Sequence, residues 1–259
     1  MPRFVHGNAQ IHYDVFGEGK PLVFIPGIGV GGNIWMPVIE KTAERFQCIT
    51  IDTRGAGFSN VPRGPYSMAD IAEDVAALCR SLDIENPVVA GHSMGGFAAL
   101  TLLVTVAFPV AGLVLVATGA TGAVIRDDFM SAVPGETRND VVDRIVRHGV
   151  GSCASSEMKE RLRSLILSRP LRGMGYLSQR AAVTTFDITG DLSRVTVPCC
   201  IVHGTDDAVI PIETARAVAE EMDRSTFLPL LGVGHFPIVE APDATADAVM
   251  ELASTAFSP

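Results

Sequence analysis

The sequence predicts an α/β fold in which helices cover both faces of a mostly parallel sheet. Two observations indicate this class. Short runs rich in Val, Ile and Leu alternate with amphipathic stretches of helix length, and continuously apolar runs are typical of strands buried on both faces. The alternation stops between residues 119 and 194, where charge-rich helical patterns replace the apolar runs. This break predicts a helical segment inserted into the sheet domain.

The expected strands are apolar runs bounded by turn residues, at 21–25, 48–52, 87–91, 111–117, 198–204 and 225–231. Two earlier segments, near Phe4 and from Ile11 to Phe16, alternate polar and apolar residues. This pattern predicts an antiparallel hairpin at one edge of the sheet. Amphipathic or apolar stretches predict helices at 34–45, 68–82, 94–108, 212–222 and 244–256.

We expect residues 1–118 and 195–259 to form the core and residues 119–194 to form a helical cap, called the cap segment below. Its patterns NDVVDRIVRHG and SSEMKERLRSLIL are helical in period. The cap segment holds 11 Lys and Arg against 9 Asp and Glu, whereas the rest of the chain holds 9 against 20. Ten of the 17 arginines lie in it. They form either a solvated face paired with the acidic core or a site for an anionic substrate.

Size, charge and cysteine content narrow the class of protein. The 259 residues are 47% hydrophobic, enough for a large core without disulfides. A net charge of −9 argues against a nucleic-acid partner, which requires a basic surface. The five cysteines show no metal-ligand or redox spacing, and Cys199 and Cys200 are expected on opposite faces of one strand. The first residues lack the apolar stretch of a secretory signal, so we expect reduced thiols and a cytoplasmic protein.

The window from Asn86 up to, but not including, Arg126 contains no Asp, Glu, Lys or Arg and is long enough to suggest a membrane span. Glycines and Pro109 divide it into a strand, a turn, a helix and a second strand. A buried part of an α/β core explains the same apolar signal, and no membrane partner is expected.

Two glycine-rich segments compete as functional motifs. GIGVGG, with Gly27, Gly29 and Gly32, matches a dinucleotide-binding fingerprint, and Asp52 ends the next strand at about the right distance. Three glycines in a turn recur by chance, however, and Pro26 interrupts the turn. GHSMG, at residues 91–95, has the form G-x-S-x-G between a strand and a helix, where a serine sits in a strained turn that exposes its hydroxyl.

Together with GHSMG, four further motifs complete a pattern that resembles the α/β-hydrolase superfamily from Ile11 to Ala256. They are PGIG after the third expected strand, DTRGAGFS after the fourth, HGTDDAVIP after the seventh and GHFPIVEAPD after the eighth. GHSMGG follows the fifth strand, so the five motifs occur in family order. The resemblance implies the α/β-hydrolase fold with an inserted cap. DTRGAGFS looks like the family's loop after the fourth strand, which makes a ribose-binding role for Asp52 unnecessary.

A serine hydroxyl needs a base and the base needs a carboxylate, which together make a catalytic triad. Ser93 is the nucleophile of the elbow, and His235 is the best placed of six histidines because it follows the last strand in a glycine-flanked loop. The family pattern selects Asp207 as the acid, three residues after Gly204. Its neighbour Asp206 is then a turn or helix-cap residue.

The oxyanion of an acyl intermediate requires backbone N–H donors. Met94, the first residue after the nucleophile, supplies one, and the resemblance assigns the other to Ile28. The common His-Gly of that family loop is Pro26-Gly27 here. The departure leaves the Ile28 amide available but removes a side chain that often braces the loop.

The expected activity is that of a serine hydrolase that cleaves a small-molecule carboxylic ester or lactone and needs no metal or organic cofactor. The chain looks most like small esterases and 3-oxoadipate enol-lactonases. A carbon-carbon bond hydrolase acting on a diketone, a cofactor-free perhydrolase or lyase, and a non-catalytic ligand receptor remain alternatives on the same fold. The residues expected either in the cap core or on a pocket wall are Phe129, Met130, Leu171, Met174 and Tyr176, while Trp35 is expected in the core.

Overall fold

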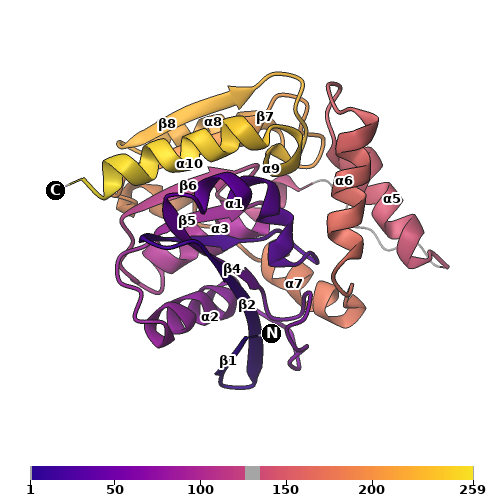
Figure 1. The fold of residues 1–259 in the computed structure, drawn as a ribbon, viewed down its shortest axis with the longest axis horizontal. Helices are drawn as coiled ribbons and strands as arrows, with labels where there is room; N and C mark the ends of the chain where they lie inside the picture. Colours follow the sequence, from indigo (N-terminus) through magenta and orange to yellow (C-terminus); the bar gives the residue numbers. More distant parts are fainter. Residues whose placement is uncertain (1, 126–134, 259) are drawn as a thin grey trace.

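The computed structural model describes residues 2–125 and 135–258, and the main feature of this part is one eight-stranded sheet (Figure 1). Its strand order is β1-β2-β4-β3-β5-β6-β7-β8. The strands are β1 (Arg3–His6), β2 (Ala9–Phe16), β3 (Lys20–Ile25), β4 (Phe46–Asp52), β5 (Val88–His92), β6 (Gly112–Val116), β7 (Cys199–Gly204) and β8 (Ser225–Leu230). Every predicted strand is present, with ends within two residues of the expected ones.

The N-terminal hairpin lies at one edge, as its alternating pattern predicted. β1 pairs antiparallel with β2, and β2 pairs antiparallel with β4, with His12 opposite Asp52. From β4 to β8 all neighbours are parallel. The carboxyl ends of these strands therefore meet at one edge of the sheet, where the loops after β3, β4, β5 and β7 carry the motifs.

Helices cover both faces of the sheet. The core on one face includes α2 (Met68–Ser81), α3 (Met94–Val104) and α8 (Ile212–Glu221). The core on the other face includes α1 (Met36–Thr42), α9 (Pro237–Glu240) and α10 (Pro242–Ala256). Cys199 belongs to the first core and Cys200 to the second, so their predicted placement on opposite faces is confirmed. Trp35 is fully buried in the second core.

Two predicted helices are shorter than expected. The segment 34–45 divides into a 3₁₀ turn (Gly32–Trp35) and α1, because Pro37 lies in the first turn of α1, where its missing N–H does no harm. The helix expected at 94–108 ends at Val104. Phe108 precedes Pro109 and is disfavoured in helical conformation, and Ala107 has a φ of 54°.

In the described residues of the cap segment, three helices lie between β6 and β7, and α5 and α6 project from one side of the molecule (Figure 1). They are α5 (Arg138–Gly149), α6 (Ser156–Leu167) and α7 (Gly173–Thr184), flanked by 3₁₀ turns at Gly122–Val124 and Thr189–Arg194. The two charge-rich patterns form α5 and α6. Thr137 starts α5 with a capping box to Asp140, as its sequence spacing favours.

The cap segment leaves and rejoins the core at one place, called the neck. Thr121 and Asp187 form an antiparallel bridge there. The Gly122 amide donates to the Phe186 carbonyl at 2.9 Å, and the Ile188 amide donates to the Ala120 carbonyl at 2.9 Å. The two connections are therefore tied side by side.

The uncharged window folds as β5, α3 and β6, all buried in the core, which is the division that its glycines predicted. Among residues 2–125 and 135–258, no helix is long and apolar enough to cross a bilayer.

Candidate active site

Ser93 occupies a strained turn between β5 and α3. Its φ of 54° and ψ of −120° are rare for a residue with a side chain. The turn is held from both ends, because the Ser93 amide donates to the Val116 carbonyl at 2.9 Å and the Thr118 hydroxyl donates to the Ser93 carbonyl at 2.8 Å. A Cβ at Gly95 would collide with the Ile25 carbonyl oxygen. A Cβ at Gly91 would collide with the Gly95 carbonyl oxygen, so the approach of β3 requires the second glycine of G-x-S-x-G and the turn itself requires the first.

His235 lies in the loop that follows β8, residues 231–236, called the histidine loop below. Its Nδ1 is 2.8 Å from Oδ2 of Asp207, which lies in the loop after β7. Both residues are buried. An ionised carboxylate can only accept, so we assign the shared proton to Nδ1, which leaves Nε2 of His235 as an acceptor.

The Asp207 carboxyl group is built to stay ionised. Its Oδ1 accepts from the amides of Val209 at 2.8 Å and Ile210 at 2.9 Å, and His203 Nε2 is 3.3 Å from Oδ2. Burial alone would raise its pKa, but the adjacent His235 and His203 outweigh burial and hold the pKa well below its ordinary value. Asp206 is exposed and accepts from the Ser152 amide at 3.1 Å and from the Ser152 hydroxyl, away from His235.

His92, the variable residue of the elbow, lies beneath His235. Its Nε2 is 2.7 Å from the His235 carbonyl oxygen, and its ring packs against those of His235 and Phe236. Burial, reinforced by the positive charge that His235 can carry, lowers the pKa of His92 to about 3. His92 is therefore a neutral hydrogen-bond donor that supports the histidine loop.

One predicted oxyanion donor belongs to the residue after Ser93, and the other belongs to a loop that approaches Ser93 at Gly27. Met94 is the first residue of α3, where amides have no acceptor within the helix. Ile28 lies in the loop after β3, residues 26–32, called the glycine loop below. In the part of the chain that the structure describes, neither amide donates a hydrogen bond to the protein.

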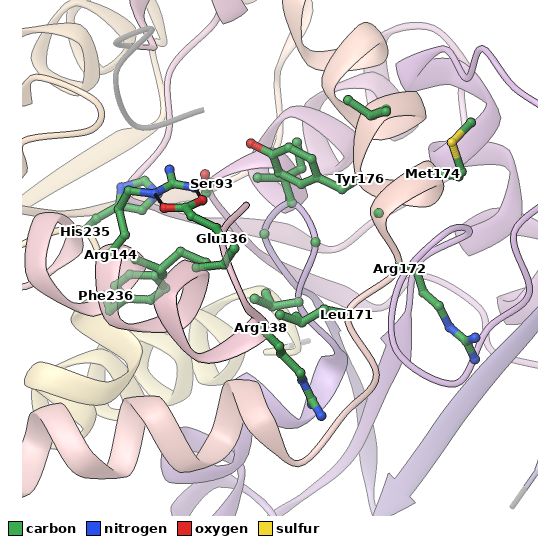
Figure 2. A pocket seen from close by; sticks show the side chains of 18 of the residues that line it. Ser93, Glu136, Arg138, Arg144, Leu171, Arg172, Met174, Tyr176, His235 and Phe236 are labelled. Atoms are coloured by element: carbon green, nitrogen blue, oxygen red, sulfur yellow. Dashed lines mark hydrogen bonds and ion pairs between the residues drawn. The ribbon is translucent and has the colours of Figure 1, made fainter. Parts of the chain in front are cut away.

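A cavity of about 670 Å³ opens over Ser93 and His235 (Figure 2). Its walls come from the glycine loop, the elbow, the histidine loop and the cap segment, and they are mainly apolar. The cap segment contributes Glu136, Thr137, Arg138, Val141, Arg144, Ile145, Leu171, Arg172, Gly173, Met174, Tyr176 and Leu177. Leu171, Met174 and Tyr176 are thus pocket walls, whereas Phe129 and Met130 lie outside the described residues.

Comparison with known proteins decides the family. The model of the alpha/beta hydrolase family matches residues 22–248. The chain is an alpha/beta hydrolase. One relative of this hydrolase is the pimeloyl-[acyl-carrier protein] methyl ester esterase of Aliivibrio salmonicida, which is 26% identical over 91% of this chain and 93% of its own.

Solved structures agree with this hydrolase in fold. A thermophilic esterase from Thermogutta terrifontis superimposes with a TM-score of 0.86 at 24% identity over the whole of both chains. The enol-lactonase from Burkholderia xenovorans LB400 superimposes with a TM-score of 0.85 at 22% identity, over 98% of this chain and 100% of its own. The predicted α/β-hydrolase fold is confirmed.

Most cap arginines of the hydrolase are engaged by the protein itself. Arg169 binds Asp14 at 2.7 Å and Asp52 at 3.2 Å in the core. Asp52 also accepts hydrogen bonds from the amides of Gly32 at 2.7 Å and Phe58 at 2.8 Å, so its role is to hold these loops and Arg169 together. Further ion pairs join Arg144 to Glu136, Arg161 to Glu40, Arg163 to Asp143 and Arg194 to Asp191.

Two residues at this site of the hydrolase were not anticipated. Glu240 accepts from the amides of Gly234 and Phe236, on both sides of His235, and from the Gly151 amide of the cap segment at 2.7 Å. It lies within the motif GHFPIVEAPD, which could have drawn attention to it. Gln179 of α7 binds the Gly29 amide of the glycine loop at 2.8 Å. No local pattern marks Gln179, because its partner lies 150 residues earlier.

Proposed function

We propose that this hydrolase cleaves a carboxylic ester or a lactone through an acyl-enzyme on Ser93. One observation carries the proposal. A serine in a strained elbow lines the same cavity as a histidine whose Nδ1 is bonded to a buried carboxylate. Such a set matches the nucleophile, general base and orienting acid of acyl transfer.

In the first half of the cycle, Nε2 of His235 takes the Ser93 hydroxyl proton as Oγ attacks the carbonyl carbon of the substrate. Asp207 stabilises the imidazolium that results and keeps its orientation. The negative charge moves to the carbonyl oxygen, which the amides of Ile28 and Met94 receive. The carbon-oxygen bond to the leaving group then breaks, and His235 returns the proton to the departing oxygen.

In the second half, water attacks the acyl-enzyme while His235 takes one of its protons. Collapse of the second tetrahedral intermediate breaks the bond to Ser93 Oγ, which regains the proton from His235. A lactone follows the same steps, except that its alcohol stays attached to the acyl group. Ser93, His235 and water account for every proton transfer of this cycle.

The cavity supports a small-molecule substrate with a substantial apolar part. Its volume of about 670 Å³ falls within the usual range of ligand sites, and Ile28, Leu171 and Phe236 are among its apolar walls. The Aliivibrio salmonicida relative is named as a methyl ester esterase, which agrees with an ester as the substrate.

An alkyl fluorophosphonate probe tests the proposal. It should label the wild-type protein stoichiometrically, and peptide mapping should find the label on Ser93. A panel of esters, lactones and a diketone then separates the alternatives. Ester or lactone turnover without diketone cleavage supports the proposal, diketone cleavage alone supports a carbon-carbon bond hydrolase, and no labelling supports a ligand receptor.

A further inference from the structure

Gln179 is a polar side chain with no exposure to solvent, on the helix α7 of the cap segment. Burying a carboxamide without hydrogen-bond partners is unfavourable, so the partners of Gln179 indicate its role. Its Oε1 accepts from the Gly29 amide at 2.8 Å. Its Nε2 donates to the Thr53 hydroxyl at 3.0 Å and to the Arg54 carbonyl at 2.7 Å.

These partners fix the orientation of the carboxamide. The Gly29 amide can only donate and the Arg54 carbonyl can only accept, so Oε1 must face the first and Nε2 the second. The side chain thereby joins the glycine loop after β3 to the loop after β4. Both loops belong to the core, whereas Gln179 belongs to the cap segment.

Helix α7 packs closely against the glycine loop and the loop after β4. A Cβ at Gly175 would overlap the backbone of Gly55, so the first turn of α7 approaches the loop after β4 backbone to backbone. The next residue, Tyr176, packs on the glycine loop, where a Cβ at Gly29 would lie 3.0 Å from its ring. Figure 2 shows Tyr176 on the cavity wall. Gln179 follows Tyr176 by three residues and therefore lies on the same face of the helix.

The bond to Gly29 bears directly on the Ile28 amide. The Gly29 N–H belongs to the peptide plane that follows Ile28, and Gly29 itself has a φ of 72°, which glycine adopts freely. A loop with Gly27, Gly29, Gly31 and Gly32 has much backbone freedom to lose. An anchored plane after Ile28 limits the directions in which the Ile28 N–H can point.

We infer that Gln179 is a positioning residue for the oxyanion site, so that a cap element sets the geometry of one of its two donors. The inference rests on the proposed acyl transfer at Ser93 for its catalytic consequence. It assigns to the cap segment a part in stabilising the transition state, in addition to forming the cavity wall. A donor displaced by about 1 Å can cost on the order of 100-fold in rate.

The experiment compares Gln179→Met, which keeps the length of the side chain and removes its hydrogen bonds, with Arg161→Met. Arg161 binds Glu40 on the surface at 2.9 Å and so joins the cap segment to α1 of the core without a bond to the glycine loop. Gln179→Met should lower kcat for a p-nitrophenyl ester by about 10- to 100-fold, with KM within about threefold of wild type. Arg161→Met should leave both constants unchanged.

A tetrahedral mimic provides a second measurement. An alkyl trifluoromethyl ketone adds to Ser93 and presents an oxyanion, so its affinity should fall by the same factor as kcat/KM in Gln179→Met. If Gln179 only fastened the cap segment, its substitution would act through lost cavity contacts. It would then raise KM for the ester and lower the affinity for the ketone by the same factor. An unchanged kcat, or a loss confined to KM, would overturn the inference.

Hydrogen exchange of the glycine loop tests the anchoring without catalysis. Peptides covering residues 22–35 should exchange at least 10-fold faster in Gln179→Met than in wild type and Arg161→Met. Thr53→Val is the substitute variant if Gln179→Met does not fold. It removes one partner of the carboxamide and keeps the bond to Gly29, so the exchange rate of these peptides should increase by a smaller factor. Unchanged exchange in a folded Gln179→Met, or in Thr53→Val where it alone folds, would overturn the inference. Absence of wild-type ester turnover would instead count against the proposed function.

Discussion

The ring of His92 supports the backbone of His235, with 2.7 Å between Nε2 of the first and the carbonyl oxygen of the second. The elbow and the histidine loop are thus joined below the cavity by a group that stays neutral. Its pKa of about 3 follows mainly from burial and secondly from the charge of His235. A charged His92 would place a positive ring about 5.0 Å from the ring of His235.

The low pKa of His92 predicts a pH-dependent stability. As the pH falls below the ordinary value of 6.5, the unfolded chain takes up a proton on His92 that the folded chain refuses until about pH 3. The stabilisation from neutral His92 is therefore complete above pH 6.5 and declines between pH 6.5 and 3, by at most about 1.4 kcal/mol per pH unit. His92→Gln, which keeps a donor of similar reach, should show a shallower decline in urea unfolding between pH 7.5 and 5. Parallel declines would contradict the assignment.

Ser93→Ala should remove ester hydrolysis, with a loss in kcat on the order of 10³ to 10⁶, because the catalytic residues act as a unit. The fold should persist, although the strained φ of 54° suits alanine no better than serine. Steady-state kinetics on freshly purified protein, with circular dichroism as the check on folding, measures the effect. Turnover close to that of wild type would place the nucleophile elsewhere.

Asp207→Asn should reduce kcat by about 10⁴-fold, because an amide would favour the wrong tautomer of His235. Its neighbour offers a matched control. Asp206 is exposed and bonded to Ser152, so Asp206→Asn should change kcat by no more than a few-fold. Equal losses in the two variants would mean that the acid has been assigned wrongly.

Charge on the cap segment is expected to play little part in substrate selection. Arg172 lines the cavity, but its Nε donates to the Gly57 carbonyl at 3.2 Å, and in Figure 2 its side chain points away from Ser93. Arg172→Glu should therefore change KM for a carboxylate-bearing ester and for a neutral ester of similar shape by the same factor. A selective rise for the anionic ester that added salt diminishes would show that the charge selects substrate.

Sequence patterns predicted the sheet well because its parallel strands are buried on both faces and therefore uniformly apolar. A uniformly apolar pattern also explains why the predicted ends of helices were less accurate, because it does not mark where a helix stops. The run from Met94 to Phe108 is apolar except for Gly95, Gly96, Thr101 and Thr105, and nothing in it marks the end of α3 at Val104 or the φ of 54° at Ala107. Helix α7 was not predicted at all. Its buried face includes Gly175 and Gln179, which do not form an apolar stripe.

The site could be predicted where chemistry is local and not where it depends on contacts distant in sequence. Ser93 is marked by glycines within two residues, and Asp207 by its spacing from Gly204. The carboxylate of Asp207 is indeed bonded to His235. Gln179 and Gly29, by contrast, meet only because α7 folds back over the core. The role of His92 beneath His235 likewise depends on a pairing across 143 positions.

The neck at Thr121 and Asp187 has a consequence for how such proteins diversify. The chain leaves and re-enters the core at one point, so the two ends of the cap segment lie side by side and the segment is equivalent to a closed loop. Doubling the length of such a loop costs only about 0.6 kcal/mol in closure entropy. Cap segments of other lengths and shapes can therefore be exchanged at this point during evolution or in chimaeric proteins. An exchange that keeps an active core must reproduce two contacts with the loops around Ser93. These are the carboxamide that holds Gly29 and the Gly149 carbonyl that accepts from the His235 amide at 2.6 Å.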